Sequence, residues 1–367
     1  MEGEVFMYNA TIKVLEKINT SGFEAYVVGG YPRDIYLGRK SSDVDICTNA
    51  TPKDIKDIFK NVILPTYEYG SVTVIYNKVR FEITTYRKDL KYINNRIPSK
   101  VKYTDDLFED LRRRDFTINT LCMNSNGEII DVLGIKDDLD SRIIRTVGDA
   151  KNKISEDSLR ILRAIRFSTI LDFELDKDLK KAIKKYGYLL QKLSYYRKKE
   201  ELDKIFASVN IEKGLKLIKE LELDRYLELK NLDNLIITPS TINIWAQLGV
   251  TDIYSFTNND KDTIIKVNEI KDKEITDYIL YKYGLYICSL VTEFNNISKK
   301  DIIERYNNLA IHSKSEINIT AQEICEVLDR KAGSFIKDIY AKLEELIIEN
   351  KLENDNDIIK EFVKANF

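Results

Sequence analysis

The sequence predicts an α+β fold, in which an N-terminal region of about 150 residues holds the strands and the remainder is almost entirely helical. Short β-rich runs, such as 72–76 and 81–84, are confined to the N-terminal region, where glycine, proline and threonine also concentrate. Beyond about Ala150, apolar residues recur at helical spacing, for example at Leu159, Leu162 and Ile165. The chain has 367 residues, so we expect roughly two to four packed units.

The composition is that of a globular protein, with 43% hydrophobic and 32% charged residues. No run of about 18 uncharged apolar residues occurs, and the N-terminus lacks a basic segment followed by an apolar one, so we expect a cytoplasmic protein with no membrane partner. The formal net charge is only -2. A nucleic-acid-binding face would therefore have to be local.

Histidine and cysteine are too scarce to build a metal site. His312 is the single histidine, which excludes histidine clusters. The four cysteines show no CxxC spacing and are expected to be reduced core residues; they are Cys47, Cys122, Cys288 and Cys325. Any metal ion must be held by carboxylates.

A strand, a glycine turn and a helix start are predicted within residues 27–34. Gly29 and Gly30 allow a ligand to approach the backbone closely, and Pro32 suits the first helical turn. The amides of such a turn and the helix N-terminus favour anions, and Arg33 adds a fixed charge. This pattern indicates a phosphate-binding turn; an ordinary strand-to-helix turn is the alternative.

Asp43 and Asp45 are the candidate metal ligands. The period of two along a strand places both carboxylates on one face. Neighbouring carboxylates repel unless cations lie between them, and Mg²⁺ prefers carboxylate and phosphate oxygens. A two-metal arrangement would activate an attacking hydroxyl and stabilise a leaving pyrophosphate. A solvated strand end is the alternative, and Glu82, within the run 81–84, is a candidate third carboxylate.

Turn residues separate the remaining predicted elements. Asn77-Lys78 lies between the β-rich runs 72–76 and 79–85 and predicts a hairpin, and Gly127 predicts a second turn. Four residues mark expected turns between helices: Gly187, Gly214, Pro239 and Gly249.

The glycine turn, the pair Asp43 and Asp45, and the strand residue Glu82 follow one another in an order that resembles the polymerase-β-like nucleotidyltransferase superfamily. More narrowly, residues 28–34 and 43–52 are similar to the first motif of class II tRNA nucleotidyltransferases (CCA-adding enzymes) and bacterial poly(A) polymerases. This resemblance implies a polymerase-β-like head with a small mixed sheet, followed by an all-helical neck, body and tail.

The resemblance also implies a division of labour along the chain. The catalytic head would span 1–148, the nucleotide-selecting neck 149–206, the body 207–300 and the tRNA-binding tail 301–367. The substrates would be tRNA, CTP and ATP, with Mg²⁺ as the cofactor. The motifs match closely between about residues 20 and 170, and the helical remainder matches in architecture alone.

Residues 110–119 resemble the family's ribose-checking motif, in which Arg114 and Asp115 would bind the 2'-hydroxyl. A hydroxyl both donates and accepts, so that an arginine and an aspartate can satisfy it together. A run of surface salt bridges is the alternative interpretation of these residues.

Residues 156–160 match the family's Glu-Asp-x-x-Arg motif, which selects the base. On one helix Glu156, Asp157 and Arg160 would share a face. A carboxylate accepts from the exocyclic amine of C or A, and arginine donates to the adjacent ring nitrogen, whereas U and G present a carbonyl. The alternative is a helix-stabilising ion pair. Arg163, with Arg166, continues at a spacing of three and would bind phosphates or form a solvated basic face.

Residues 85–98 correspond to the flexible loop that the family uses to change from C to A, and that CC-only enzymes lack. Asp89, Tyr92 and Arg96 are retained, but Asn94 stands where an acidic residue is usual. Losing one ion pair of about 1 kcal/mol would weaken the switch without abolishing it. The sequence therefore predicts complete CCA addition, with a slower A step.

Other activities stay open at this point. Within the family the alternatives are an A-adding enzyme and a poly(A) polymerase. A catalytically degenerate RNA-binding protein is an alternative of a different class, but such a protein would be expected to have lost Asp43 or Asp45.

Overall fold

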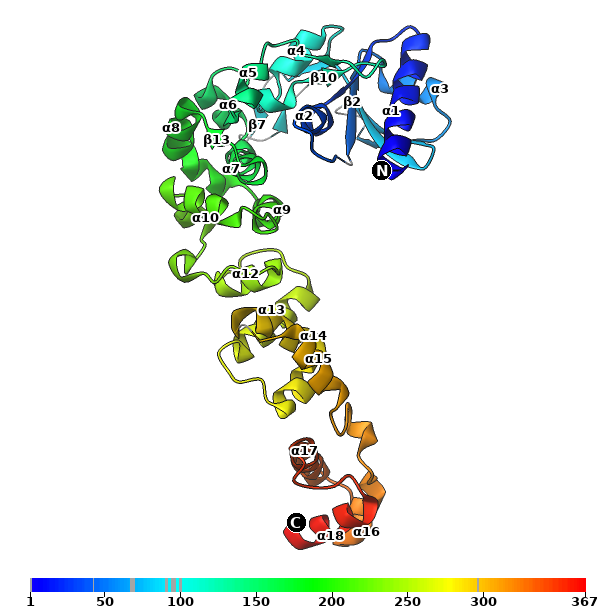
Figure 1. Cartoon of the computed structure of the whole chain (residues 1–367), viewed down its shortest axis with the longest axis vertical. Coiled ribbons are helices and arrows are strands. Elements are labelled where there is room, and N and C mark those ends of the chain that lie inside the picture. Colours follow the sequence, from blue (N-terminus) through cyan, green and yellow to red (C-terminus); the bar gives the residue numbers. More distant parts are fainter. Residues whose placement is uncertain are drawn as a thin grey trace. The chain divides into compact units, whose positions relative to one another are not determined.

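The computed structural model describes residues 2–41, 43–66, 70–89, 92–93, 97–98, 101–295 and 297–367. The chain forms two compact units, Met1–Glu228 and Leu229–Phe367. The first holds a sheet and several helices, and the second is helical (Figure 1). Within the described residues, no helix is long and apolar enough to cross a membrane.

A seven-stranded sheet in the order β11-β10-β1-β2-β5-β4-β3 forms the centre of the first unit, as far as the described residues show. Its strands are β1 (Ala25–Val28), β2 (Val44–Thr48), β3 (Val62–Thr66), β4 (Ser71–Tyr76), β5 (Val79–Thr85), β10 (Cys122–Met123) and β11 (Ile129–Ile130). The pair β2 and β5 is parallel, and the other pairs are antiparallel. The predicted α+β fold with a small mixed sheet is confirmed.

The two faces of this sheet differ. Helices α1 (Glu2–Thr20) and α3 (Pro52–Ile58) lie along one face (Figure 1), where Ile46, Phe81 and Ile83 are buried in the larger core. Because side chains alternate along a strand, the residues between these apolar positions point to the opposite face. Asp45 and Glu82 therefore share the face that α1 does not cover.

The expected turns are confirmed with one exception. Asn77 and Lys78 have φ values of 49° and 65° and connect β4 to β5 as a hairpin. Gly127 (φ 80°) lies between β10 and β11, and Gly249 (φ 64°) follows a helix end. The prediction of a turn at Gly214 was wrong, because this residue lies inside the helix Ile211–Glu220. A Cβ there would stand 2.6 Å from a methyl group of Ile205, so that the glycine allows two helices to approach.

The described residues between 87 and 103 include two short antiparallel strand pairs. Strand β6 (Arg87–Asp89) pairs with β9 (Val101–Tyr103), and β7 (Tyr92–Ile93) pairs with β8 (Ile97–Pro98). Two of the predicted switching residues, Asn94 and Arg96, lie outside the described residues.

The remaining helices belong to both units. In the first unit they are α2 (Gly30–Tyr36), α4 (Leu107–Arg112), α5 (Lys136–Asp140), α6 (Ala150–Glu156), α7 (Leu159–Leu171), α8 (Lys177–Tyr186), α9 (Tyr195–Phe206), α10 (Ile211–Glu220) and α11 (Asp224–Leu227). Short strands β12 (Ile143–Ile144) and β13 (Glu174–Leu175) pair in parallel between them. The second unit contains α12 (Thr241–Gln247), α13 (Asn258–Ile270), α14 (Asp277–Asn295), α15 (Lys299–Asn307), α16 (Ala321–Leu328), α17 (Phe335–Ile348) and α18 (Asn356–Asn366).

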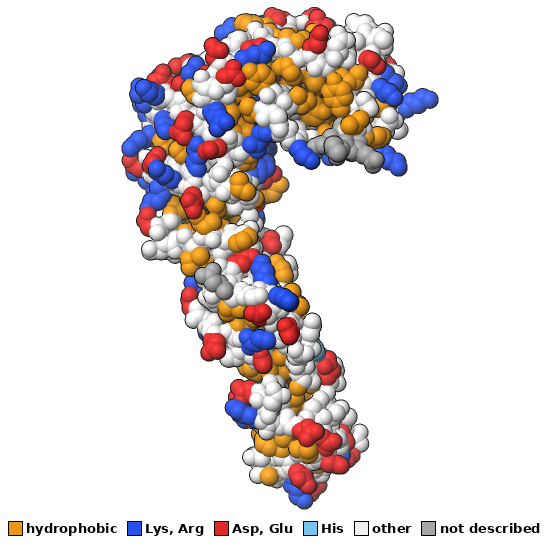
Figure 2. All heavy atoms as spheres, in the orientation of Figure 1, with side chains coloured by type: hydrophobic (Ala, Val, Ile, Leu, Met, Phe, Trp, Pro, Cys, Tyr) orange, Lys and Arg blue, Asp and Glu red, His pale blue; other side chains and the backbone are white. Residues whose placement is uncertain are grey.

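The cysteines are free thiols, as expected, and three of the four are buried. On the visible surface of the helices that follow the sheet, side chains of both signs are interspersed (Figure 2). In α8, for instance, Lys181 pairs with Asp178, and Lys184 pairs with Glu222 of a neighbouring segment. These lysines therefore do not form a purely basic face.

Candidate functional site

The glycine turn lies directly against the predicted metal ligands. Strand β1 ends at Val28, and Gly29 takes up φ 86° and ψ −130°, a conformation that is open to glycine alone. A Cβ at Gly29 would stand 3.4 Å from Oδ2 of Asp45. Any side chain at this position would therefore be strained and would press on the carboxylate.

Two carboxylates lie side by side on the free face of the sheet. Asp45 on β2 is the register partner of Glu82 on the parallel strand β5, and Asp43 precedes β2 by one residue. All three side chains are exposed, and none of them has an ion-pair partner among the described residues. The structure thus brings Asp45 and Glu82 together, whereas Asp43 lies outside the strand on which it was predicted.

The carboxylates affect one another electrostatically. Partial loss of hydration raises the pKa of Asp45, and the negative charges of Glu82 and then Asp43 raise it further. The positive charges of Arg114 and Arg163 act in the opposite direction. The site therefore carries an excess of negative charge that a bound cation would neutralise.

The acids by themselves do not form a complete cage. Within the part of the chain that the structure describes, no group of three His, Cys, Asp or Glu side chains is arranged to hold a metal ion. Mg²⁺ is usually held by one or two carboxylates together with substrate phosphates, and seldom by a protein cage alone. The unpaired Asp43 and Asp45 fit this kind of binding.

Arg33 of the glycine turn points into the protein. Its Nε and Nη2 donate to the carboxylate of Asp34 at 2.9 and 3.0 Å, and its Nη1 donates to Oδ1 of Asn119 at 2.8 Å. Only 7% of Arg33 is exposed. The arginine is therefore held rigidly behind the turn.

Arg114 and Asp115, the predicted ribose pair, have separate partners. Nη2 of Arg114 donates to Oδ2 of Asp110 at 3.2 Å, and Asp110 is fully buried. Nε of Arg114 is also buried and has no hydrogen-bond partner among the described residues. An unsatisfied buried N–H is costly unless a ligand accepts from it.

Asp115 accepts three hydrogen bonds from charged and polar groups. Arg163 Nε donates to its Oδ2 at 2.7 Å, Asn119 Nδ2 donates to its Oδ1 at 3.2 Å, and the Phe116 amide donates to the same Oδ1 at 2.8 Å. Burial by itself would raise the pKa of Asp115, but Arg163 and these hydrogen bonds together hold it well below its usual range. The carboxylate therefore stays ionised.

The base-selecting residues do not share one continuous helix, and that prediction was wrong. Helix α6 ends at Glu156, Asp157 has extended backbone angles, and α7 begins at Leu159. The Asp157 carboxylate accepts from the Leu159 amide at 3.0 Å, which replaces a bond that a continuous helix would make. Glu156 and Arg160 nevertheless meet across the break at 2.8 Å.

Arg160 is fixed by more than this ion pair. Its Nη1 also donates to the backbone carbonyl of Lys153 at 2.8 Å, and 6% of the residue is exposed. Burial raises the pKa of Asp157, although the Leu159 amide and Arg160 oppose the shift. Asp157 and Arg160 therefore stand at a junction between two helices, where side chains from both meet.

Arg163 and Arg166 do not form a solvated basic face, and that alternative was wrong. Arg163 is bound to Asp115, and Arg166 Nε donates to Oε2 of Glu201 on α9 at 2.6 Å. The ring of Phe167 lies 5.3, 5.4 and 4.2 Å from the guanidinium carbons of Arg33, Arg163 and Arg166. One buried ring thus contacts three arginines through cation–π interactions.

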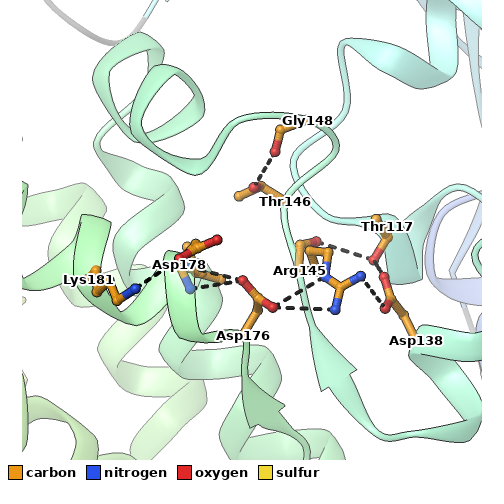
Figure 3. A network of polar contacts seen from close by, with 9 residues as sticks. Thr117, Asp138, Arg145, Thr146, Gly148, Asp176, Asp178 and Lys181 are labelled. Carbon is orange, nitrogen blue, oxygen red and sulfur yellow. Dashed lines mark hydrogen bonds and ion pairs between the residues drawn. The ribbon is translucent and has the colours of Figure 1, made fainter.

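A second polar network is centred on Arg145 (Figure 3). Arg145 pairs with Asp138 at 3.2 Å and with Asp176 at 3.3 Å, and Thr117 Oγ1 donates to Asp138 at 2.8 Å. A hollow of about 620 Å³ beside Arg145 contains none of the predicted site residues. The hollow and the predicted site residues therefore do not overlap.

Three family models match this chain. Residues 25–145 match the poly A polymerase head domain, residues 255–363 match tRNA nucleotidyltransferase domain 2, and residues 172–232 match a model described as "Probable RNA and SrmB- binding site of polymerase A". A CCA-adding enzyme of Staphylococcus haemolyticus is 32% identical over 393 residues, which cover 98% of each chain. The chain belongs to the CCA-adding enzyme family.

Other members of the CCA-adding enzyme family are similar to this chain in sequence and in structure. A CCA-adding enzyme of Lactococcus lactis subsp. cremoris is 35% identical, covering 96% of this chain and 94% of the relative. The crystal structure of the Bacillus stearothermophilus CCA-adding enzyme in complex with CTP superposes with a TM-score of 0.88 at 27% identity and covers 98% of this chain and 97% of the other. A Thermotoga maritima CCA-adding enzyme complexed with tRNA shares the fold, with a TM-score of 0.67 at 20% identity.

Three residues of this site had no role in the prediction from sequence. Asp110 and Asn119 lie within the ribose motif, and Phe167 lies on α7. Asn119 and Phe167 contact Arg33 across sequence separations that no local pattern reveals. Asp110, by contrast, binds Arg113 and Arg114, which lie three and four residues further along the chain. The available signal was the polar character of Asn119 beside apolar neighbours at Ile118 and Leu121.

Proposed function

We propose that this protein adds CCA to the 3' end of tRNA from CTP and ATP and releases pyrophosphate, in the cytoplasm where these substrates occur. One observation carries the proposal. Unpaired sheet carboxylates lie in the same unit as buried arginine–carboxylate pairs, in a chain that is 32% and 35% identical to CCA-adding enzymes over nearly its full length.

Asp43 and Asp45 hold the divalent cation that nucleotidyltransferases of this family use, and we propose that it is Mg²⁺. When bound, it supplies positive charge to the triphosphate and to the attacking 3'-hydroxyl of the tRNA. Glu82, next to Asp45 on the parallel strand, adds negative charge and is the third candidate ligand. The raised pKa of Asp45 supports a cation between these acids.

The phosphates and the ribose are held by the glycine turn and the ribose pair. Gly29 and Gly30 let the triphosphate approach the backbone amides, and Arg33 lends its charge from behind the turn. Arg114, whose buried Nε has no partner among the described residues, donates to the 2'-hydroxyl, and Asp115 accepts from it. This arrangement selects ribonucleotides.

The base is read by the groups at the junction of α6 and α7. Asp157 accepts from the exocyclic amine of C or A, Arg160 donates to the adjacent ring nitrogen, and Glu156 holds Arg160. Arg163 keeps Asp115 ionised and oriented. A wrong base leaves buried polar groups unpaired, which is how such sites reach high selectivity.

The roles of the four predicted parts of the chain are also proposals. Residues 1–148 perform catalysis, 149–206 select the nucleotide, and 207–300 and 301–367 bind the tRNA. The Glu201–Arg166 pair, which joins α9 to α7, supports a rigid selecting region.

The test uses three tRNA transcripts, ending before CCA, after C and after CC, each incubated with CTP, ATP and Mg²⁺. We expect all three to end in CCA when their 3' ends are sequenced, with pyrophosphate released in proportion. An A-adding enzyme would extend only the transcript that ends in CC, and a poly(A) polymerase would add several A residues. Absence of any product would indicate a degenerate RNA-binding protein.

The loop at residues 85–98 remains the proposed switch from C to A. In the same assay, deletion of residues 88–95 should leave CC addition intact and stop A addition. Equal loss of C and A addition would show that the loop is structural. The change Asn94→Asp should accelerate the A step, because it restores the acidic residue usual at this position.

A further inference from the structure

Asn119 lies between the glycine turn and the ribose pair. It ends the 3-10 turn Thr117–Asn119, and 6% of it is exposed. Its Oδ1 accepts from Arg33 Nη1 at 2.8 Å, and its Nδ2 donates to Asp115 Oδ1 at 3.2 Å. A single buried amide thus connects the arginine of the phosphate turn to the carboxylate of the ribose motif.

The chemistry of the partners fixes the orientation of this amide. A guanidinium can only donate, and an ionised carboxylate can only accept. The oxygen of Asn119 must therefore face Arg33, and its nitrogen must face Asp115. An aspartate in the same place would offer two acceptors, and a leucine would offer neither group.

Both partners and the turn itself are held in place. Arg33 is bound to Asp34 through two nitrogens, so its Nη1 has a defined position. The Thr117 amide donates to the Arg145 carbonyl at 2.9 Å, and the Thr117 hydroxyl donates to Asp138 (Figure 3). Movement of Asn119 would therefore disturb groups on either side of it.

We propose that Asn119 is a positioning residue, which holds Asp115 in register with Arg33 so that the ribose and the triphosphate of one nucleotide are aligned together. The inference rests on the proposed function. It predicts that Asn119 governs the preference for CTP over dCTP, since Asp115 can bind the 2'-hydroxyl only if its carboxylate is oriented. Asn119 itself touches no reacting atom in this arrangement.

Two variants of equal size separate the roles of the amide. Asn119→Leu removes both hydrogen bonds, and Asn119→Asp keeps an acceptor for Arg33 but places a second carboxylate against Asp115. At about pH 8 we expect each variant to reduce the ratio of kcat/KM for CTP to that for dCTP by about tenfold, the usual effect of losing a hydrogen bond to a charged group. Asn126→Asp, in an exposed turn, adds the same charge elsewhere and should leave the ratio unchanged.

A pH series gives a readout that a merely structural role would not move. In Asn119→Asp, two adjacent carboxyls share a proton as the pH falls, and the protonated group again donates to Asp115 while it accepts from Arg33. The charged groups around this position are Arg33 and Asp34 on α2, Asp138 on α5, Asp115 on the same segment, and Arg163 on α7. The selectivity for CTP should therefore recover in this variant, relative to wild type, as the pH falls far enough for the two carboxyls to take up their shared proton.

Asn119→Leu cannot regain a donor and should show no recovery, and thermal unfolding identifies any variant that does not fold. An unchanged CTP to dCTP ratio in both folded variants would overturn the inference, as would a pH series for Asn119→Asp that runs parallel to wild type. If wild type itself adds no nucleotide to tRNA, the proposed function fails instead, which separates the two outcomes.

Discussion

Two groups of carboxylates lie close together in the first unit, and the protein treats them in opposite ways. Asp45 on the sheet has like-charged neighbours and no ion-pair partner among the described residues, and its pKa is raised. Asp115 at the helical side is bound by an arginine, an amide side chain and a backbone amide, and its pKa is lowered. Both carboxylates lose hydration, so the groups around them account for the opposite shifts of the two pKa values.

The comparison indicates what each group is built to bind. Carboxylates that repel one another store unfavourable energy, which a ligand with positive charge relieves. A carboxylate that is already neutralised and oriented, such as Asp115, costs little to rearrange when a neutral hydroxyl arrives. Asp45 and Glu82 are thus suited to a cation, and Asp115 is suited to an uncharged group.

Neutralising a sheet acid is expected to have the largest effect. Asp45→Asn keeps the size of the side chain but removes a cation ligand, and nucleotide addition should fall by at least about 10² to 10³-fold. Binding of tRNA, measured by filter binding, should persist. Asp57→Asn, an exposed acid on α3, is the control and should retain full activity. Activity within a few-fold of wild type in Asp45→Asn would remove this residue from the metal site.

Neutralising the paired acid should instead reduce stability. Asp115→Asn leaves the Arg163 guanidinium without its counter-charge, and we expect the free energy of unfolding in urea to fall by about 2 to 3 kcal/mol at neutral pH. Asp105→Asn, on the exposed surface, is the matched control. Asp115→Asn should also bring dCTP closer to CTP as a substrate.

The stability that Asp115→Asn loses depends on pH in a defined direction. Because the pKa of Asp115 is lowered in the folded protein, its stabilising contribution is present above the ordinary aspartate pKa of about 3.9 and is lost as the pH falls through the lowered value. The difference in stability between wild type and Asp115→Asn should be constant from about pH 8 to about pH 5 and shrink below about pH 4. A difference that grows on acidification would contradict the ion-pair assignment.

Local patterns in the sequence predicted much of the sheet and the acids on it, but not the edge strand β3. The alternation of apolar residues along β2 and β5 places Asp45 and Glu82 on one face, and the glycine turn follows from Gly29 and Gly30 alone. These features depend on neighbouring residues, whose spacing the sequence displays directly. The register between β2 and β5, by contrast, was visible only in the structure.

The helical side was harder to predict because its contacts are not local. The pairing of Glu156 with Arg160 at a spacing of four is the same in a continuous helix and across the break at Asp157, so that spacing could not reveal the break. Arg114 and Asp115 are adjacent in sequence but bind different partners. Arg114 binds Asp110, which lies four residues before it, whereas Asp115 binds Arg163 on α7. Helix packing, not sequence spacing, brings Arg163 to Asp115.

A fourth prediction concerns base selectivity on the helical side. Asp157→Asn replaces an acceptor by a group that can also donate, and a donor suits the O4 carbonyl of U. The ratio of CTP to UTP incorporation should fall by about tenfold or more, with little change in triphosphate binding. Asp178→Asn, exposed on α8, serves as the control. If selectivity is unchanged and only stability falls, Asp157 is a helix-capping residue and does not read the base.

The smallest expected effect concerns whether a cation and the triphosphate bind jointly at the sheet acids. Since the described residues include no three-donor cage, Mg²⁺ alone should hardly change the thermal unfolding of wild type. CTP with Mg²⁺ should stabilise it more than CTP with a chelator, by about 1 kcal/mol, or about 2 °C in Tm. Asp45→Asn should bind CTP without this increment, whereas Asp115→Asn should retain it, because its sheet acids are intact. An equal increment in Asp45→Asn would mean that the cation binds only to the triphosphate, and the contrast between the two groups of carboxylates would then not extend to ligand binding.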